Sequence, residues 1–255
     1  MGSAVGIGVQ VVYYLQHLLR VDGALASEPG WRQATFGKTL ARHFQFALPI
    51  AATFISATFA THVCMLIYAK MSLSAFAAMT LIAPWNMVAG QISMQWTQAT
   101  GIMVAQLLGK RASEPVLDSF LSAAWKGAFV MAGIVALVFL GLMLSVDWLY
   151  GDLSRDTRLI LIGFLPLLLI LPFPRTTNAV CGNTLRASGD TIYVMKLFLW
   201  SQWLFRVPAT AIAVLIFDLS AFWVLALLLV EEILKFWPFH SRLWAGNWKR
   251  ALVAE

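Results

Sequence analysis

The sequence predicts an all-α fold, namely a polytopic bundle of membrane-spanning helices. Of the 255 residues, 60% are hydrophobic and 12% are charged, and the mean hydropathy is +0.77. A typical globular chain is about a quarter charged, so this composition argues against a soluble fold. Continuous apolar runs recur, and several reach the roughly 20 helical residues that cross the hydrocarbon core of a bilayer.

Each apolar run is expected to form one helix and to end at a polar or charged segment. A partial span comes first, at about residues 4–19, and stops at Arg20. Six full spans follow, at about residues 43–69, 73–108, 116–146, 159–185, 192–217 and 219–239. The second and third are longer than a bilayer requires, so we expect them to tilt or to extend beyond it. Ser113 is expected to be the N-cap of the third full span's helix, with Pro115 in the first turn of that helix.

The predicted spans divide the chain into three segments. Residues 1–42 hold the partial transmembrane helix and a cytoplasmic linker, residues 43–240 a six-helix transmembrane lobe, and residues 241–255 a cytoplasmic tail. A partial helix, a linker and six spans suggest a longer protein, in which the partial helix is the last span of a first half. No repeat is visible within the chain, as expected for one half of a duplicated transporter.

Basic residues mark one side of the predicted membrane region. That side carries Arg20, Arg32, Lys38, Arg42, Lys110, Arg111, Lys126, Arg186, Lys196, Lys235, Arg242, Lys249 and Arg250. Because basic loops face the cytoplasm, we expect a protein of the cytoplasmic (inner) membrane with a cytoplasmic C-terminus. These loops also explain the net charge of +6, so the lipid bilayer is an expected partner and nucleic acid is not.

Four short motifs occur in order along the six predicted spans. Leu-Arg-Ala-Ser-Gly-Asp-Thr at 185–191 forms a cytoplasmic turn that contains Arg186, Gly189 and Asp190. The others are a Leu-Pro pair at 48–49, Val-Ala-Gln-Leu-Leu-Gly at 104–109 and a Trp-rich basic stretch at 244–250. Together they resemble motifs of the multidrug and toxic compound extrusion (MATE) family, within the wider group of lipid and polysaccharide flippases.

The resemblance covers residues 42–250 and corresponds to the C-terminal half of the family, its helices seven to twelve. It implies two lobes around a central cleft, and export of amphipathic, often cationic compounds in exchange for protons or sodium ions. A separate N-terminal lobe or a second copy of the chain would complete the cleft. Many sodium-coupled members carry an acidic residue in helix seven or helix ten. The segment that corresponds to helix seven contains His43 and His62 but no aspartate or glutamate, and the segment that corresponds to helix ten contains Arg175. The coupling ion stays open between H⁺ and Na⁺, and no other cofactor is implied.

A polar stretch interrupts the second full span. Gln91, Gln95 and Gln98 recur at spacings of four and three, so they share a helix face. Amides are costly in hydrocarbon, so this face is expected to point inward. With Trp96, it is predicted to line a cleft for a small amphipathic substrate. Hydrogen bonding between helices is the competing interpretation.

Charged residues inside the spans form a second candidate site. Arg175 lies near mid-membrane, and Glu231 and Glu232 lie in the inner half of the last span. Since intramembrane charges face a cavity or a partner, Arg175 is predicted to pair with one of these glutamates. The pair would either lock helices together or take part in substrate binding or proton coupling. His62 could relay protons, because histidine titrates near neutral pH, or could be a hydrogen-bonded structural residue.

Three further features bear on function. Pro172 and Pro174 are predicted to kink the helix before Arg175, as a hinge or as a static bend. Cys64 and Cys181 are expected to be buried free thiols. The sequence shows no Ser–His–Asp arrangement, no glycine-rich phosphate loop and no metal-binding HExxH motif. We therefore expect no catalytic or metal site.

The sequence therefore favours a non-enzymatic, MATE-like secondary efflux transporter that works by alternating access. One alternative is a flippase for lipid-linked oligosaccharides of the same superfamily. The other is a non-transporting membrane subunit or a truncated remnant.

Overall fold

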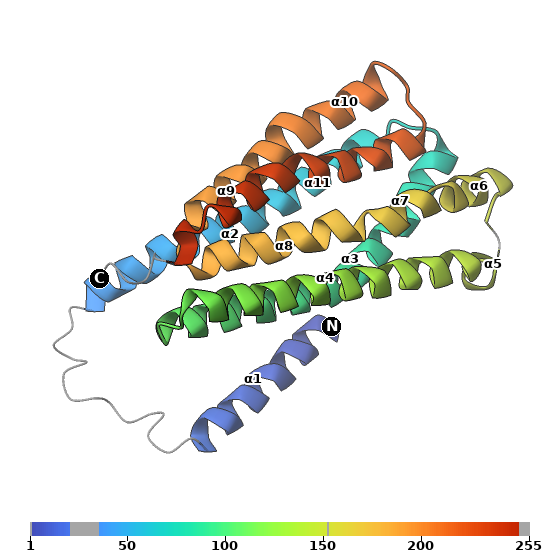
Figure 1. The fold of residues 1–255 in the computed structure, drawn as a ribbon. Helices are drawn as coiled ribbons and strands as arrows, with labels where there is room; N and C mark the ends of the chain where they lie inside the picture. The colour runs from blue at the N-terminus through green and yellow to red at the C-terminus, as the bar shows by residue number, and fades with distance from the viewer. Residues whose placement is uncertain (1, 21–35, 152, 250–255) are drawn as a thin grey trace. The chain divides into compact units, whose positions relative to one another are not determined.

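The computed structural model describes residues 2–20, 36–151 and 153–249. Within them the chain is helical and contains no strand (Figure 1). The helices are α1 (Gly2–Arg20), α2 (Phe36–Tyr68), α3 (Leu73–Gly109), α4 (Glu114–Leu144), α5 (Val146–Leu149), α6 (Arg155–Gly163), α7 (Leu165–Ile170), α8 (Pro172–Ala187), α9 (Thr191–Leu199), the π-helical η1 (Trp200–Arg206), α10 (Val207–Leu215), α11 (Ala221–Trp244) and the 3₁₀ turn η2 (Asn247–Lys249). The predicted all-α fold is confirmed.

The chain forms two compact units, residues 1–45 and 46–255. The first contains α1 and the beginning of α2, and the second contains the rest of α2 and every later helix. The predicted segments 1–42, 43–240 and 241–255 stay predictions, and residues 21–35 and 250–255 of the first and last lie outside the described part.

Several helices are long and apolar enough to cross a membrane, as the sequence predicts for a multi-pass membrane protein. Among the described residues four meet both criteria, compared with the six full spans that the sequence predicts: His43–Tyr68, Leu73–Gly109, Glu114–Leu144 and Thr191–Leu215. The bent pair Arg155–Ile170 and Pro172–Ala187 makes a fifth if it is one span. The last predicted span corresponds to α11, which has 24 residues but carries Glu231, Glu232 and Lys235.

Helix α8 is the central helix of the second unit, with α3, α4 and α11 packed around it (Figure 1). Its predicted kink is confirmed, because the segments before and after Leu171 are bent by 42°. Proline has no N–H to donate, so helix hydrogen bonds are lost at this point. The hydroxyl of Thr176 adds one bond back to the helix by donating to the Pro172 carbonyl at 2.7 Å.

Local sequence explains how the long helices begin and approach one another. Ser113 precedes α4 and Pro115 lies in its first turn, but the Ser113 side chain makes no capping hydrogen bond. Ser72 and Ser154 do cap their helices, each accepting an N–H at 3.3 Å. Gly101 lets α3 approach α8, since a Cβ there would lie 3.2 Å from the backbone oxygen of Asn183.

Buried polar residues form a layer between two apolar clusters. One cluster includes Phe139, Leu168 and Val224, and the other includes Val104, Leu185 and Phe239. On four helices the residues between these clusters are polar and buried: Thr97, Thr100, Thr176, Thr177, Asn178, Ser201, Gln202, Glu231 and Lys235. The apolar clusters hold the helices together, and the polar layer is where a site can form.

Candidate functional site

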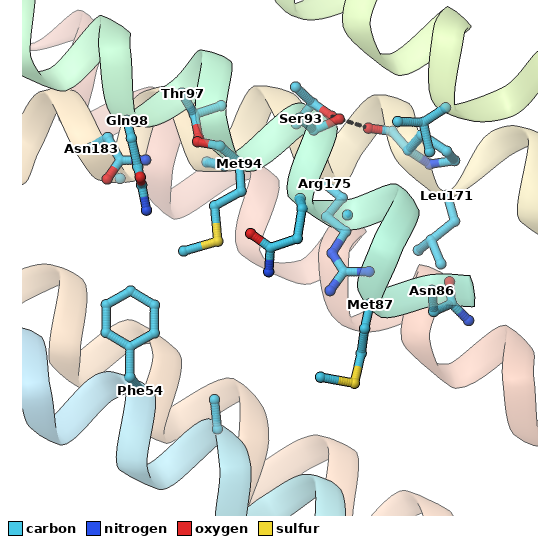
Figure 2. A pocket seen from close by; sticks show the side chains of 18 of the residues that line it. Phe54, Asn86, Met87, Ser93, Met94, Thr97, Gln98, Leu171, Arg175 and Asn183 are labelled. Atoms are coloured by element: carbon cyan, nitrogen blue, oxygen red, sulfur yellow. Dashed lines mark hydrogen bonds between the residues drawn. The ribbon is translucent and has the colours of Figure 1, made fainter. Parts of the chain in front are cut away.

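A pocket of about 330 Å³ opens at this polar layer between α2, α3 and α8. Figure 2 shows Phe54 of α2 on one wall and Met87, Met94 and Gln98 of α3 on the other, with Arg175 of α8 extending between them. Asn86, Gln91, Ser93, Asn183 and Arg186 also line the pocket. The lining therefore combines flexible apolar side chains with amides, hydroxyls and two guanidinium groups.

The structure brings two of the four predicted cleft residues to this pocket. Gln91 and Gln98 line it, whereas Gln95 and Trp96 are not among its described lining residues. Helical geometry explains the division. Gln98 lies within about 20° of Gln91 around the helix axis, Gln95 is about 40° away, and Trp96 is about 140° away.

Trp96 instead connects α3 to α4. Its Nε1 donates a hydrogen bond of 3.0 Å to the carbonyl of Ala124, and its ring lies where a side chain at Gly127 would have to be. The ring fits only because Gly127 has none. Trp96 is thus placed for helix packing, the use that competes with cleft lining for such residues.

Arg175 is placed in the pocket but not in the predicted ion pair. It forms no salt bridge with Glu231 or Glu232 among the described residues. Both glutamates are taken by Lys235, whose Nζ lies 3.3 Å from Glu231 Oε1 and 2.9 Å from Glu232 Oε1. Lys235 is three and four residues further along the same helix, which is the spacing at which helical side chains meet.

The charged cluster consists of Arg206, Glu231, Glu232 and Lys235. Arg206 Nε lies 3.9 Å from Glu231 Oε2, which links η1 to α11. The side chains of Glu231 and Lys235 are only 5% and 4% exposed, so their charges depend on these partners. Sequence reasoning assigned Lys235 to the cytoplasmic side. Its helical spacing from the glutamates was the signal that could have found it.

Polar groups from neighbouring helices complete the charged cluster. Ser201 Oγ donates to Glu231 Oε1 at 3.1 Å, and Asn178 Nδ2 donates to Glu232 Oε2 at 3.0 Å. The Lys235 ammonium also stands 5.0 Å from the centre of the Phe198 ring. Helices α8, α9, η1 and α11 therefore meet at this point.

A second set of hydrogen bonds ties α2 to η1. Ser56 Oγ donates to Gln202 Oε1 at 3.0 Å and accepts from Trp203 Nε1 at 2.7 Å. Arg206 Nη2 lies 3.4 Å from the hydroxyl of Thr61. The η1 partners lie on a segment wound as a π-helix, a form that often occurs at functional sites. Sequence patterns do not reveal this winding.

His62 is not brought to the charged cluster by any described contact. Its side chain is exposed, and its Nδ1 lies 2.7 Å from the carbonyl oxygen of Thr58 in the preceding turn. This local hydrogen bond corresponds to the structural alternative for His62.

The turn residues have separate roles. Gly189 adopts φ +95°, a conformation that side-chain-bearing residues rarely take, so the turn requires glycine. Asp190 Oδ2 accepts from Arg242 Nε at 2.9 Å and fastens the turn to α11. The Arg186 side chain extends away from the turn, and its guanidinium carbon lies 5.5 Å from the Phe54 ring centre and 5.6 Å from that of Phe198. It belongs to the pocket.

The fold of the chain is similar to that of a solved membrane transporter. The chain is similar to a solved multidrug resistance MATE family transporter of the MOP superfamily in an outward-facing conformation, with a TM-score of 0.60 and 18% identity. The fold is MATE-like. The match covers 77% of this chain and 44% of the solved one, so the chain spans less than half of that protein's length. No protein-family model and no curated protein matches the chain.

Proposed function

We propose that this chain forms one lobe of a secondary transporter that exports a small amphipathic molecule by alternating access. The observation that carries the proposal is the pocket at the polar layer of a MATE-like lobe. Its methionine and phenylalanine side chains suit the apolar part of such a molecule. Its amides, with Gln91 and Gln98 as the proposed substrate contacts, suit the polar part.

We assign the coupling step to the charged cluster. Glu231 joins α11 to η1 through Arg206, and Glu232 joins α11 to α8 through Asn178. Protonation of Glu231 would remove the charge that attracts Arg206. Protonation of Glu232 would weaken the link to α8, where Asn178 also donates to the Glu232 backbone carbonyl at 2.8 Å. The cluster could therefore transmit the coupling ion, H⁺ or Na⁺, to the packing of three helices.

Two irregular helices would accommodate the movement. The bend at Leu171 lies directly before Arg175, and the π-helical η1 carries Arg206. Bends and π-helical turns are places where helices change direction without breaking many hydrogen bonds. A movement at Leu171 would shift the pocket residue Arg175, and a movement in η1 would shift the cluster residue Arg206.

A complete cleft requires a second lobe in this proposal, either a separate N-terminal lobe or a second copy of the chain. The solved transporter, of which the match covers 44%, supports this requirement. We place the protein in the cytoplasmic membrane with its C-terminus in the cytoplasm, on the basis of its basic loops.

Export assays test the proposal. Cells depleted of their main efflux pumps would express the chain alone, as a tandem of two copies, or with a candidate N-terminal lobe. They would be loaded with a fluorescent amphipathic cation or anion. We expect energy-dependent export in at least one arrangement, reduced by Gln91→Ala together with Gln98→Ala. Ser122→Ala, on the exposed face of α4, serves as the control.

The alternatives give different results in the same cells. A membrane-inserted protein that exports no compound in any arrangement would contradict the proposal and favour a non-transporting subunit or remnant. Accumulation of lipid-linked oligosaccharide on deletion of the gene, without dye export, would favour a flippase.

A further inference from the structure

The pocket carries an excess of positive charge. Arg175 and Arg186 line it, and no aspartate or glutamate is among its described lining residues. The nearby basic residues Arg206 and Lys235 are already matched by Glu231 and Glu232. Arg175 also acts electrostatically on Glu232 of the cluster. Two carboxylates nevertheless face four basic side chains, so an excess of positive charge remains.

Helix α8 places both arginines on one stripe. Arg175, Ala179, Asn183 and Arg186 all line the pocket, at successive spacings of four, four and three residues. Such residues lie one above another on a helix, so the Cα atoms of the two arginines are about three turns, or about 16 Å, apart along α8. The short side chain of Ala179 leaves the space between them open.

Neither guanidinium forms an ion pair within the described part of the chain. Arg175 extends into the pocket between the α3 residues Met87 and Met94 (Figure 2). Arg186 lies over the rings of Phe54 and Phe198, and its buried Nε has no hydrogen-bond partner. A guanidinium has five N–H donors and no acceptor, so the exposed Arg175 and the half-buried Arg186 both retain donors that an acceptor in the pocket can use.

The remaining lining determines what kind of acceptor fits. Met87, Met94, Phe54 and Leu171 make an apolar wall beside the arginines. A pocket with charges of one sign and low-dielectric walls concentrates its field and attracts ions of the opposite sign. It repels a cation at the same position.

We propose that this pocket binds an amphiphile with an anionic head, a phosphate or phosphonate, and an apolar tail. Arg175 contacts the head through paired N–H donors, as guanidinium groups do with phosphate oxygens. Arg186 adds a second positive anchor three turns away, and the tail lies along the methionine and phenylalanine wall. The inference rests on the proposed function only in treating this pocket as the substrate site.

Binding can be measured without transport. The purified chain would be placed in phosphatidylcholine nanodiscs and titrated with a dansyl-labelled undecyl phosphate. A dansyl-labelled undecyl trimethylammonium has the same body and the opposite charge. Energy transfer from the protein's tryptophans to dansyl reports binding, and empty nanodiscs correct for partitioning into lipid. We expect the phosphate probe to bind at least about tenfold more tightly than the ammonium probe.

Four variants connect this preference to the pocket. Arg175→Gln should weaken the phosphate probe about tenfold, and Arg175→Lys less, because lysine keeps the charge but not the paired donors. Gln98→Glu should weaken the phosphate probe and strengthen the ammonium probe. Arg155→Gln removes the same charge from an exposed site outside the pocket and should change neither.

Arg186 needs a separate control, because it packs on two aromatic rings. Arg186→Lys preserves most of the packing and the charge, and should bind nearly as wild type does. Arg186→Gln should weaken the phosphate probe severalfold at an unchanged melting temperature. If it also lowers the melting temperature, the Arg175 and Gln98 variants decide the matter, since no described hydrogen bond or salt bridge involves either side chain.

Competition identifies the source of the anion. Displacement of the probe by nanodiscs containing phosphatidylglycerol would identify a membrane phospholipid as the occupant. Displacement by added undecyl phosphate alone would identify an amphiphile that is not a bulk lipid. Both results support an anionic-head site. The proposal is overturned if the two probes bind equally, or if Arg175→Gln and Gln98→Glu both bind the phosphate probe as wild type does.

These outcomes are separable from the export assay. A charge preference without export in any arrangement would retain the site and refute the transporter. Export of cations and anions alike, with no preference in binding, would retain the transporter and refute the site.

Discussion

Replacing Lys235 with methionine tests the charged cluster directly. The substitution keeps a long unbranched side chain but removes the ammonium that contacts Glu231 at 3.3 Å and Glu232 at 2.9 Å. Glu231 would keep Ser201 at 3.1 Å and Arg206 at 3.9 Å, and Glu232 would keep only Asn178 among the hydrogen bonds that the structure shows. Glu231 would then rely on Arg206 alone for its opposite charge, and Glu232 only on the field of Arg175.

The expected loss of stability is large because the site is buried. Removing one partner of a buried ion pair costs about 3–5 kcal/mol. For a chain of this size, about 1 kcal/mol lowers the melting temperature by about 2–4 °C, so Lys235→Met should lower it by at least about 6 °C. Adding Glu232→Gln removes the unmatched charge and should restore part of the loss.

The two cysteines provide the assay. Cys64 and Cys181 are free and fully buried, as the sequence predicts, so a thiol-reactive maleimide dye labels them when the helices separate. Melting curves in detergent would compare wild type, Lys235→Met, the double variant and Lys196→Met, an exposed lysine on α9. A melting temperature for Lys235→Met equal to that of Lys196→Met would refute the buried-pair reasoning. So would a double variant in which the two losses simply add.

Three further predictions use the same preparation. Gly127→Leu should lower the melting temperature by the equivalent of about 1–3 kcal/mol, because the new side chain overlaps the Trp96 ring. A Cβ at Gly133 has no neighbour within 4 Å, so Gly133→Leu should not lower it. Equal effects of the two variants would contradict the α3–α4 contact. Gly189→Ala should cost about 1–2 kcal/mol through its φ of +95°, with Gly109→Ala as a control near the end of α3, and an unchanged melting temperature would show that the turn relaxes. Ser56→Ala should speed maleimide labelling of Cys64 in the folded protein, because Ser56 joins α2 to Gln202 and Trp203; Thr58→Ala, which loses only a bond within α2, should leave the rate unchanged.

Much of the fold could be predicted because it depends on local signals. Apolar runs set the helices, and prolines at 172 and 174 set the bend of 42°. The site was harder. Gln91 and Gln98 reach the pocket, but the three-and-four spacing that groups them with Gln95 cannot tell which part of a wide polar face meets a cavity.

The pairing of charges was the clearest difference from the sequence interpretation. Arg175 and Glu231 are far apart along the chain, and nothing in either segment says which cation reaches the carboxylate. Lys235 does so because it is on the same helix, and Arg206 because η1 packs against α11. Arg175 is then left to the pocket, which gives the site its positive charge.

By itself, the sequence determined the membrane class of this protein and most of its helical segments, because these follow from composition and the length of apolar runs. Only the tertiary structure decided which polar groups meet. It placed Trp96 against Gly127, Lys235 between two glutamates, and Arg186 beside Phe54. Such contacts depend on the rotation and offset of whole helices, which are set by packing across the lobe and not by any one segment.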